Sequence, residues 1–146
     1  MNLRGAKDIA ARAVTRFHRT VLQLSGGRLA NSGFGMPVLI LTTIGRKSGE
    51  PRSTVLTSPV QEGEAYVLVA SYGGDARHPA WFLNLRDNPD VEVTMKGHAR
   101  KMRARVASDD ERAELWPRVT AKYRGYASYQ KRTDRQIPLV ILEPSP

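Results

Sequence analysis

A short basic turn, Arg46-Lys47-Ser48-Gly49, is the part of this sequence best suited to binding chemistry, and Pro51-Arg52-Ser53-Thr54 follows it closely. Glycine lets backbone N–H groups approach a ligand, arginine forks onto phosphate oxygens, and lysine adds a point charge. The turn lies between two apolar, strand-like runs, residues 38–44 and 55–60. It predicts a site for an anionic ligand tail, and the alternative is a solvent-exposed hairpin loop that is basic without any ligand.

Two further patches contain residues suited to enclosing a planar ligand. Ser71-Tyr72-Gly73-Gly74 ends an apolar run with small residues, where a ring can approach the backbone. The alternative there is an ordinary end of a strand. Trp81 and Asn84 share one face of a predicted short helix, where they can supply a pocket wall and a hydrogen bond. The alternative for Trp81 is packing in the core.

A third patch consists of three tyrosines at every third position, Tyr123, Tyr126 and Tyr129. This spacing places their rings along one side of a helix. They are suited to enclosing an aromatic substrate or donating a hydrogen bond to it, and the alternative is an aromatic stripe packed on the sheet.

The sequence lacks the signatures of self-sufficient catalytic sites. It has no G-x-S-x-G, H-E-x-x-H or G-x-G-x-x-G motif and no cysteine, and its histidines, His18, His78 and His98, lack ligand spacing. We therefore predict no metal site. We infer that a bound cofactor performs the chemistry.

The formal net charge of +9 and the pI near 10.4 favour an anionic partner. We predict no binding to nucleic acid, because the basic residues are dispersed and no nucleic-acid-binding motif is present. No apolar run approaches the ~20 residues of a membrane span, and the arginine-rich start lacks the apolar segment of a secretory signal. Together with the absence of cysteine, this predicts a cytoplasmic protein.

Residues 1–30 are predicted to form an amphipathic basic helix, because apolar residues between Leu3 and Leu24 share one face and arginines occupy the other. One hypothesis is peripheral attachment to the anionic inner face of a membrane. The alternative is a helix that packs on the core with its basic side exposed. Residues 31–146 are expected to form the rest of a single domain.

The remaining chain predicts more strands than helices. Strands are expected at residues 36–44, 53–61, 65–71, 91–95, 99–107 and 137–142, and helices at 78–85, from 109 to about 122 and around 123–129. Ser108 and Glu111 have the spacing of a capping box at the start of the second helix. The strands follow one another as meanders, which predicts an α+β, mainly β fold: a split antiparallel barrel of about six strands with flanking helices.

Taken in this order, the patches resemble the deazaflavin-dependent nitroreductase family, whose members use coenzyme F420. The resemblance runs from about residue 37 to residue 144. It rests on LTTIGRKSG with Pro51-Arg52, on Val69-Ala70-Ser71, on HPAWFLNL, on the tyrosines and on IPLV near the end. It implies a split β-barrel.

The resemblance also implies site residues. The phosphate and glutamyl tail of the coenzyme would contact Arg46, Lys47, Ser48, Gly49 and Arg52. The ring system would lie against Ser53, Thr54, Val55, Leu56, Val69, Ala70, Ser71 and Tyr72, with Ala80, Trp81 and Asn84 closing the phosphate side. Tyr126, with Tyr123 and Tyr129, would cover the acceptor, and these tyrosines and Ser71 are the candidate catalytic residues.

The implied reaction is hydride transfer from C5 of the reduced deazaflavin to a quinone or an activated nitroaromatic acceptor. The protein would supply positioning, a dry aromatic pocket and a tyrosine proton donor. The alternatives are a split-barrel reductase that uses flavin mononucleotide (FMN) and a non-catalytic cofactor-binding protein. Tyr72 stands where lysine is common, and Ser58, expected to face the pocket, where some relatives carry tyrosine; both argue against nitroimidazole-type acceptors. A monomer and a homodimer both fit the sequence.

Overall fold

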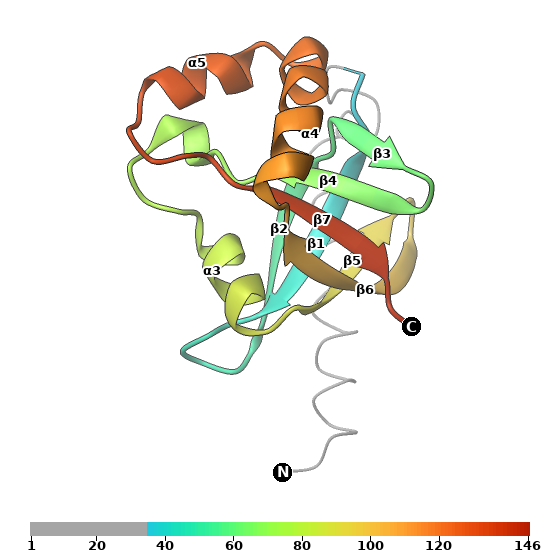
Figure 1. Ribbon diagram of the computed structural model, residues 1–146. Helices are drawn as coiled ribbons and strands as arrows, with labels where there is room; N and C mark the ends of the chain where they lie inside the picture. The colour runs from blue at the N-terminus through green and yellow to red at the C-terminus, as the bar shows by residue number, and fades with distance from the viewer. Residues whose placement is uncertain (1–34) are drawn as a thin grey trace, which may run out of the picture.

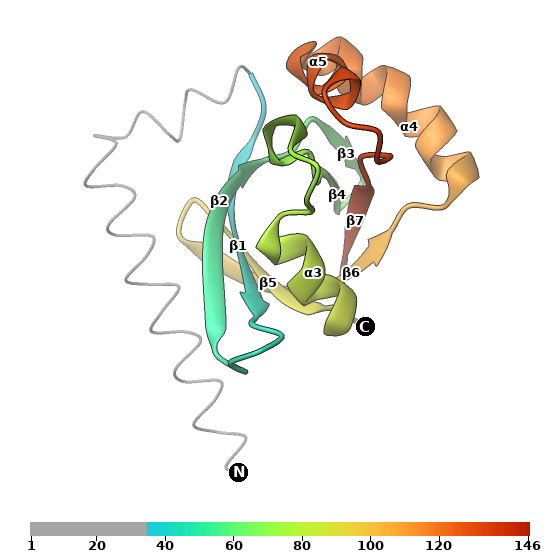
Figure 2. The ribbon, with the colours of Figure 1, turned by 90° about the vertical axis from the view of Figure 1, so that its left-hand side faces the viewer.

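The computed structural model describes residues 35–146, so the helix predicted for residues 1–30 lies outside the described residues. Seven strands form one antiparallel sheet in the order β2-β1-β5-β6-β7-β4-β3. The sheet curls into a half-barrel (Figure 1), and the view along the curl shows α3 on its inner side (Figure 2). The predicted fold, mainly β with flanking helices, is confirmed.

The bounds of the elements follow the predicted pattern closely. The strands are β1 (Val38–Ile44), β2 (Pro51–Thr57), β3 (Val60–Glu62), β4 (Ala65–Val69), β5 (Asp90–Met95), β6 (His98–Val106) and β7 (Leu139–Pro144). The helices are the short η1 (Tyr72–Gly74), α3 (Ala80–Asp87), α4 (Asp109–Lys122) and α5 (Gly125–Lys131). No described helix combines the length and apolar character needed to cross a membrane.

The strand predicted at residues 53–61 is in fact two strands, β2 and β3, which lie at opposite edges of the sheet. Pro59 between them has no N–H for a strand ladder. Ser58 is fully buried, and the single proton of its hydroxyl is shared between the carbonyls of Val60 and Val67, each 2.9 Å away. The expectation that Ser58 faces the pocket is therefore wrong, because its side chain bonds the backbone where the chain crosses between the two edges.

The strands β4 and β7 are buried on both faces over most of their length, which explains their near-continuous apolar sequence. Alternate residues of a strand point to opposite faces. One core cluster therefore receives Leu68, Val140 and Leu142 together with Phe82 and Leu85 of α3. The other receives Val67, Val69, Leu139 and Ile141 together with Leu115 and Val119 of α4. The half-barrel thus has α3 on its inner face and α4 on its outer face.

The capping box predicted at the start of α4 is present. The Ser108 hydroxyl accepts from the Glu111 N–H at 3.2 Å, and the Glu111 carboxylate accepts from the Ser108 N–H at 3.0 Å. This reciprocal pair satisfies two donors that the first helical turn leaves open. It fixes where the chain turns from β6 into the helix.

Candidate functional site

A pocket of about 760 Å³ lies where the β1–β2 turn, the start of α3, the segment after β4 and α5 meet. Its walls combine charged, hydroxyl and aromatic side chains. The lining residues are Thr43, Gly45, Arg46, Lys47, Ser48, Arg52, Ser53, Thr54, Leu56, Val69, Ser71, Tyr72, Gly73, Pro79, Ala80, Trp81, Asn84 and Tyr129. The basic turn and the aromatic patches, far apart in sequence, therefore share one cavity.

The basic turn is closed by backbone hydrogen bonds. The Gly45 N–H donates to the Glu50 carbonyl at 2.8 Å, and the Gly49 N–H donates to the Gly45 carbonyl at 2.8 Å. Gly49 adopts a φ of +72°, the left-handed region that favours glycine. A Cβ at Gly45 would lie 2.6 Å from the Ser48 hydroxyl, so glycine is needed there for the turn to fold tightly. The result is a compact loop with its cationic side chains outward.

Asn84 of α3 holds the turn in place. Its side-chain carbonyl accepts from the backbone N–H of Arg46 at 3.2 Å and from its guanidinium at 3.0 Å. Its amide donates to the hydroxyl of Thr43 at 3.2 Å. Asn84 is only 4% exposed, so these bonds satisfy a polar group that would be costly to bury without partners. Helix α3 therefore positions Arg46 at the pocket edge.

The cations of the turn differ in their partners. Arg52 lies 3.8 Å from the Glu50 carboxylate, and both side chains are exposed. Within residues 35–146, neither Arg46 nor Lys47 has an acidic side chain within ion-pair distance. Because the charges of Arg46 and Lys47 are not neutralised by the described chain, this end of the pocket is suited to an anion.

The opposite wall is formed by the segment after β4. Tyr72, Gly73 and Gly74 have φ values of +46°, +63° and +85°. A tyrosine at positive φ is uncommon and persists only where the surroundings hold it. Its side chain is 53% exposed, and the guanidinium carbon of Arg77 lies 5.8 Å from the ring centroid. The segment thus places the Tyr72 ring at the pocket, and the backbone of Tyr72 is strained there.

The three tyrosines form one cluster, of which Tyr129 lines the pocket. The ring centroids of Tyr123 and Tyr126 are 4.9 Å apart, and Tyr129 lies 6.3 Å from Tyr126. The hydroxyls of Tyr123 and Tyr129 are 3.4 Å apart. Burial raises the pKa of Tyr126, and the hydrogen bond to Tyr129 raises that of Tyr123, so both phenols stay protonated at neutral pH.

The predicted site residues divide into two groups. Most of them line the pocket: Arg46, Lys47, Ser48, Arg52, Ser53, Thr54, Leu56, Val69, Ser71, Tyr72, Ala80, Trp81, Asn84 and Tyr129. The others are not among the lining residues: Gly49, Val55, Ala70, Tyr123 and Tyr126. Ala70 is fully buried in the core, and Tyr126 is only 7% exposed, with its hydroxyl 3.5 Å from that of Thr57.

Four lining residues were not named individually as site residues from the sequence: Thr43, Gly45, Gly73 and Pro79. Thr43 carried a signal, because it is a polar residue at the end of a strand that is otherwise largely apolar. Gly45, Gly73 and Pro79 lie inside the motifs that were singled out, next to residues with more obvious chemistry. Their contribution is close backbone approach rather than a functional group.

The pocket fits a deazaflavin with an anionic tail. The cations of the turn and an apolar surface from Leu56, Val69 and the half-buried Trp81 line the same pocket. Pockets for cofactors commonly combine apolar walls with a few placed polar groups. The donor set of the site therefore matches the cofactor that the sequence predicted.

The chain is similar to known proteins that use the same cofactor. Residues 12–144 match the family model described as F420H(2)-dependent quinone reductase. An F420H(2)-dependent quinone reductase of Mycobacterium tuberculosis is 39% identical over 131 residues, 87% of each chain. A solved F420-H2 dependent reductase is 40% identical with a TM-score of 0.66, covering 73% of this chain and 94% of its own. A solved domain-swapped dimer is 34% identical with a TM-score of 0.66, covering 90% and 99%. The chain belongs to the F420H(2)-dependent quinone reductase family.

Proposed function

We propose that this chain binds reduced coenzyme F420 and catalyses hydride transfer from it to a quinone. One observation carries the proposal: a single pocket joins a turn with two unneutralised cations to an apolar and aromatic wall. Family membership supports the same cofactor and the same acceptor class. When bound, the reduced deazaflavin supplies the hydride, so the protein has to bind, orient and exclude water.

Arg46, Lys47 and Arg52 are proposed to hold the phosphate and glutamyl tail. Arginine binds phosphate oxygens in a bidentate manner, and the unneutralised charge of Lys47 adds attraction without a fixed direction. Asn84 keeps the Arg46 guanidinium in place before the ligand arrives. Binding energy gained at the tail, away from the reacting atoms, then orients the ring in the other half of the pocket.

The acceptor is proposed to bind beside Tyr72, Trp81 and Tyr129. These rings exclude water and offer flat surfaces against which a quinone can stack. Tyr129 lines the pocket, and its hydroxyl lies 3.4 Å from that of Tyr123. We propose that the Tyr129 phenol donates a hydrogen bond to the acceptor oxygen, with Tyr126 and Tyr123 holding its ring. Nitroaromatic acceptors are the broader alternative.

The proposed binding is tested by titrating the chain with coenzyme F420 and, separately, with FMN. The chain has two tryptophans. Trp116 is not among the residues that line the pocket, and its ring stacks with Arg112, whose guanidinium carbon is 4.4 Å from the ring centroid. In a Trp116→Phe background, Trp81 in the pocket wall is the sole tryptophan, so quenching of its fluorescence reports ligand binding there.

A double variant, Arg46→Gln with Lys47→Gln, tests the tail site. We expect at least about 10-fold weaker binding of the complete coenzyme. Binding of the deazaflavin chromophore without its phosphate and glutamate tail should be unchanged. Lys96→Gln with Arg103→Gln, at two exposed positions of the β5–β6 hairpin outside the pocket lining, is the charge-matched control. Preferential binding of FMN would favour the alternative cofactor. Binding of F420 without reduction of any quinone would favour a non-catalytic protein.

Two further parts of the proposal concern assembly and location. We propose a homodimer, because a 34% identical relative is a domain-swapped dimer; light scattering on the purified chain tests this.

Peripheral attachment to a membrane would depend on residues 1–34, which hold six of the 23 basic residues and one of the 14 acidic ones. Sedimentation with anionic vesicles at low salt tests it, with a chain lacking these residues as the control.

A further inference from the structure

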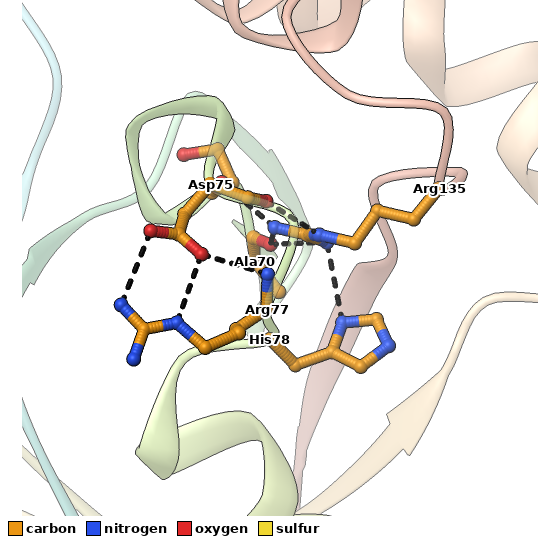
Figure 3. Close-up of polar contacts among 6 residues, drawn as sticks. Ala70, Asp75, Arg77, His78 and Arg135 are labelled. Atoms are coloured by element: carbon orange, nitrogen blue, oxygen red, sulfur yellow. Dashed lines mark hydrogen bonds and ion pairs between the residues drawn. The ribbon is translucent and has the colours of Figure 1, made fainter.

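Arg135, in the segment between α5 and β7, is surrounded by acceptors from a distant part of the chain (Figure 3). Its guanidinium donates to the Ser71 carbonyl at 2.8 Å, to the Asp75 carbonyl at 2.9 Å, and twice to the Ala70 carbonyl at 3.2 Å. One guanidinium nitrogen also lies 3.2 Å from Nδ1 of His78. A single half-buried side chain thus bonds both ends of the segment after β4.

None of these partners is a carboxylate. The Asp75 carboxylate is engaged by Arg77, through contacts of 3.1 and 3.2 Å. Burial lowers the pKa of Arg135, but an arginine side chain remains protonated at neutral pH. A partly buried cation held by neutral carbonyls is not explained by charge pairing. Its hydrogen bonds instead stabilise the backbone conformation of the segment that supplies the carbonyls.

That segment forms a wall of the pocket. Ser71, Tyr72 and Gly73 line it, and the backbone from Tyr72 to Gly74 stays in the left-handed region throughout. Such a conformation persists only when neighbouring structure determines it more strongly than local preference does. Arg135 bonds the carbonyls of Ala70 and Ser71 before the strained Tyr72 and the carbonyl of Asp75 after the two glycines.

We propose that Arg135 is a positioning residue, which acts through these carbonyls and His78 to hold the Ser71–Gly73 wall where the ring of the cofactor binds. The inference rests on the proposed function, since it assigns the wall to that cofactor. It extends the site to a residue outside the pocket lining. The two positioning residues then act on different parts of the pocket. Arg135 holds the wall proposed for the ring, whereas Asn84 holds the turn proposed for the tail.

The contacts demand arginine rather than any cation. Four acceptors lie around the guanidinium, and arginine offers five N–H donors in one plane. Lysine has three donors on a single nitrogen and cannot reach both ends of the segment at once. The conservative variant Arg135→Lys is therefore expected to keep the charge and lose the positioning.

His78 gives a readout that does not depend on any cofactor. Arginine has no acceptor nitrogen, so Nδ1 of His78 accepts and the ring proton lies on Nε2. Burial lowers the pKa of His78, and the charges of Arg135 and Arg86 lower it further. The Phe82 ring packs 4.7 Å from the imidazole. In Arg135→Gln we expect this pKa to rise, because one cationic neighbour is lost.

The experiment compares wild type, Arg135→Gln, Arg135→Lys and Arg103→Gln, an exposed arginine of β6 outside the pocket lining. The affinity for the tail-free deazaflavin chromophore is measured on the folded fraction, which thermal unfolding defines. We expect Arg135→Gln and Arg135→Lys to bind the chromophore about 10-fold or more weakly, since small misplacements of a binding wall are costly. Arg103→Gln should bind it as wild type does.

Histidine NMR of the same four proteins follows the His78 tautomer and pKa without ligand. The inference would be overturned if Arg135→Lys bound the chromophore as tightly as wild type does. It would also be overturned if the His78 spectrum of Arg135→Gln were unchanged. Failure of the wild type to bind either the chromophore or the complete coenzyme would instead overturn the proposed function. The His78 spectrum would still decide whether Arg135 bonds this segment.

Discussion

Asn84 accepts hydrogen bonds from both the backbone N–H and the guanidinium of Arg46, at 3.2 and 3.0 Å. One buried amide of α3 thereby fixes the position and the side-chain direction of a residue 38 positions earlier in the chain. The β1–β2 turn is otherwise exposed, so this contact is what ties the cationic end of the pocket to the core.

Asn84→Ala should weaken binding of complete coenzyme F420 about 10-fold, because the Arg46 guanidinium loses the acceptor that directs it. The free energy of unfolding should fall by about 1–3 kcal/mol, since Thr43 and Arg46 lose a buried partner. Fluorescence titration and urea unfolding measure the two effects. Asn88→Ala, which removes only a contact with the Asp90 N–H just after the same helix, should leave the affinity unchanged.

Gly74→Ala should destabilise the protein more than Gly73→Ala. Both glycines have positive φ, but a Cβ at Gly74 would lie 2.7 Å from the Tyr129 carbonyl, whereas one at Gly73 meets nothing within 4 Å. We expect about 1 kcal/mol for Gly73→Ala from conformation alone, and about 2–4 kcal/mol for Gly74→Ala, where the overlap with α5 adds to it. Chemical unfolding of both variants measures the difference. Equal losses would mean that α5 moves away freely.

Ser58→Ala should reduce stability without changing cofactor binding. The variant removes the hydroxyl donor that lies 2.9 Å from the carbonyls of Val60 and Val67, and the acceptor that lies 3.2 Å from the Gln61 amide. We expect a loss of about 1–3 kcal/mol in urea unfolding. The exposed Ser128→Ala in α5 should stay within about 0.5 kcal/mol of wild type. Weaker F420 binding by folded Ser58→Ala would return this residue to the pocket.

Acid should remove the stability that Glu111 supplies. Its hydrogen bond with Arg105 is the main cause that lowers the pKa of Glu111 from 4.5 to about 2. The Glu111 carboxylate is therefore protonated at a higher pH in the unfolded chain than in the folded chain. Its contribution to the free energy of unfolding is complete above pH 4.5 and is lost as the pH falls toward 2. Glu111→Gln keeps the capping geometry but should flatten this part of the pH profile of the urea midpoint. Glu114→Gln, exposed on the same helix, should keep the wild-type profile.

The local pattern of the sequence was enough for most elements. The near-continuous apolar runs of β4 and β7, and the Ser108–Glu111 spacing, involve residues a few positions apart, so their consequences can be read along the chain. The basic turn and the aromatic patches were found in the same way, because each carries its chemistry within a short segment.

The crossing at Ser58–Pro59 escaped prediction because apolar character continues on both sides of it. Periodicity describes a strand but does not say which neighbour it pairs with, and β2 and β3 end at opposite edges of the sheet. The expectation that Ser58 faces the pocket failed for the same reason.

The sequence by itself determined most of the strand and helix segments, the helix cap, the cationic turn and the kind of ligand that such a turn suits. Only the tertiary structure decided that Asn84 bonds Arg46, and that Arg135 reaches the carbonyl of Ser71, 64 residues away. Local preferences depend on neighbours along the chain, whereas these contacts depend on the order of strands in the sheet. That order is selected by burial of the whole core, so no short segment contains it.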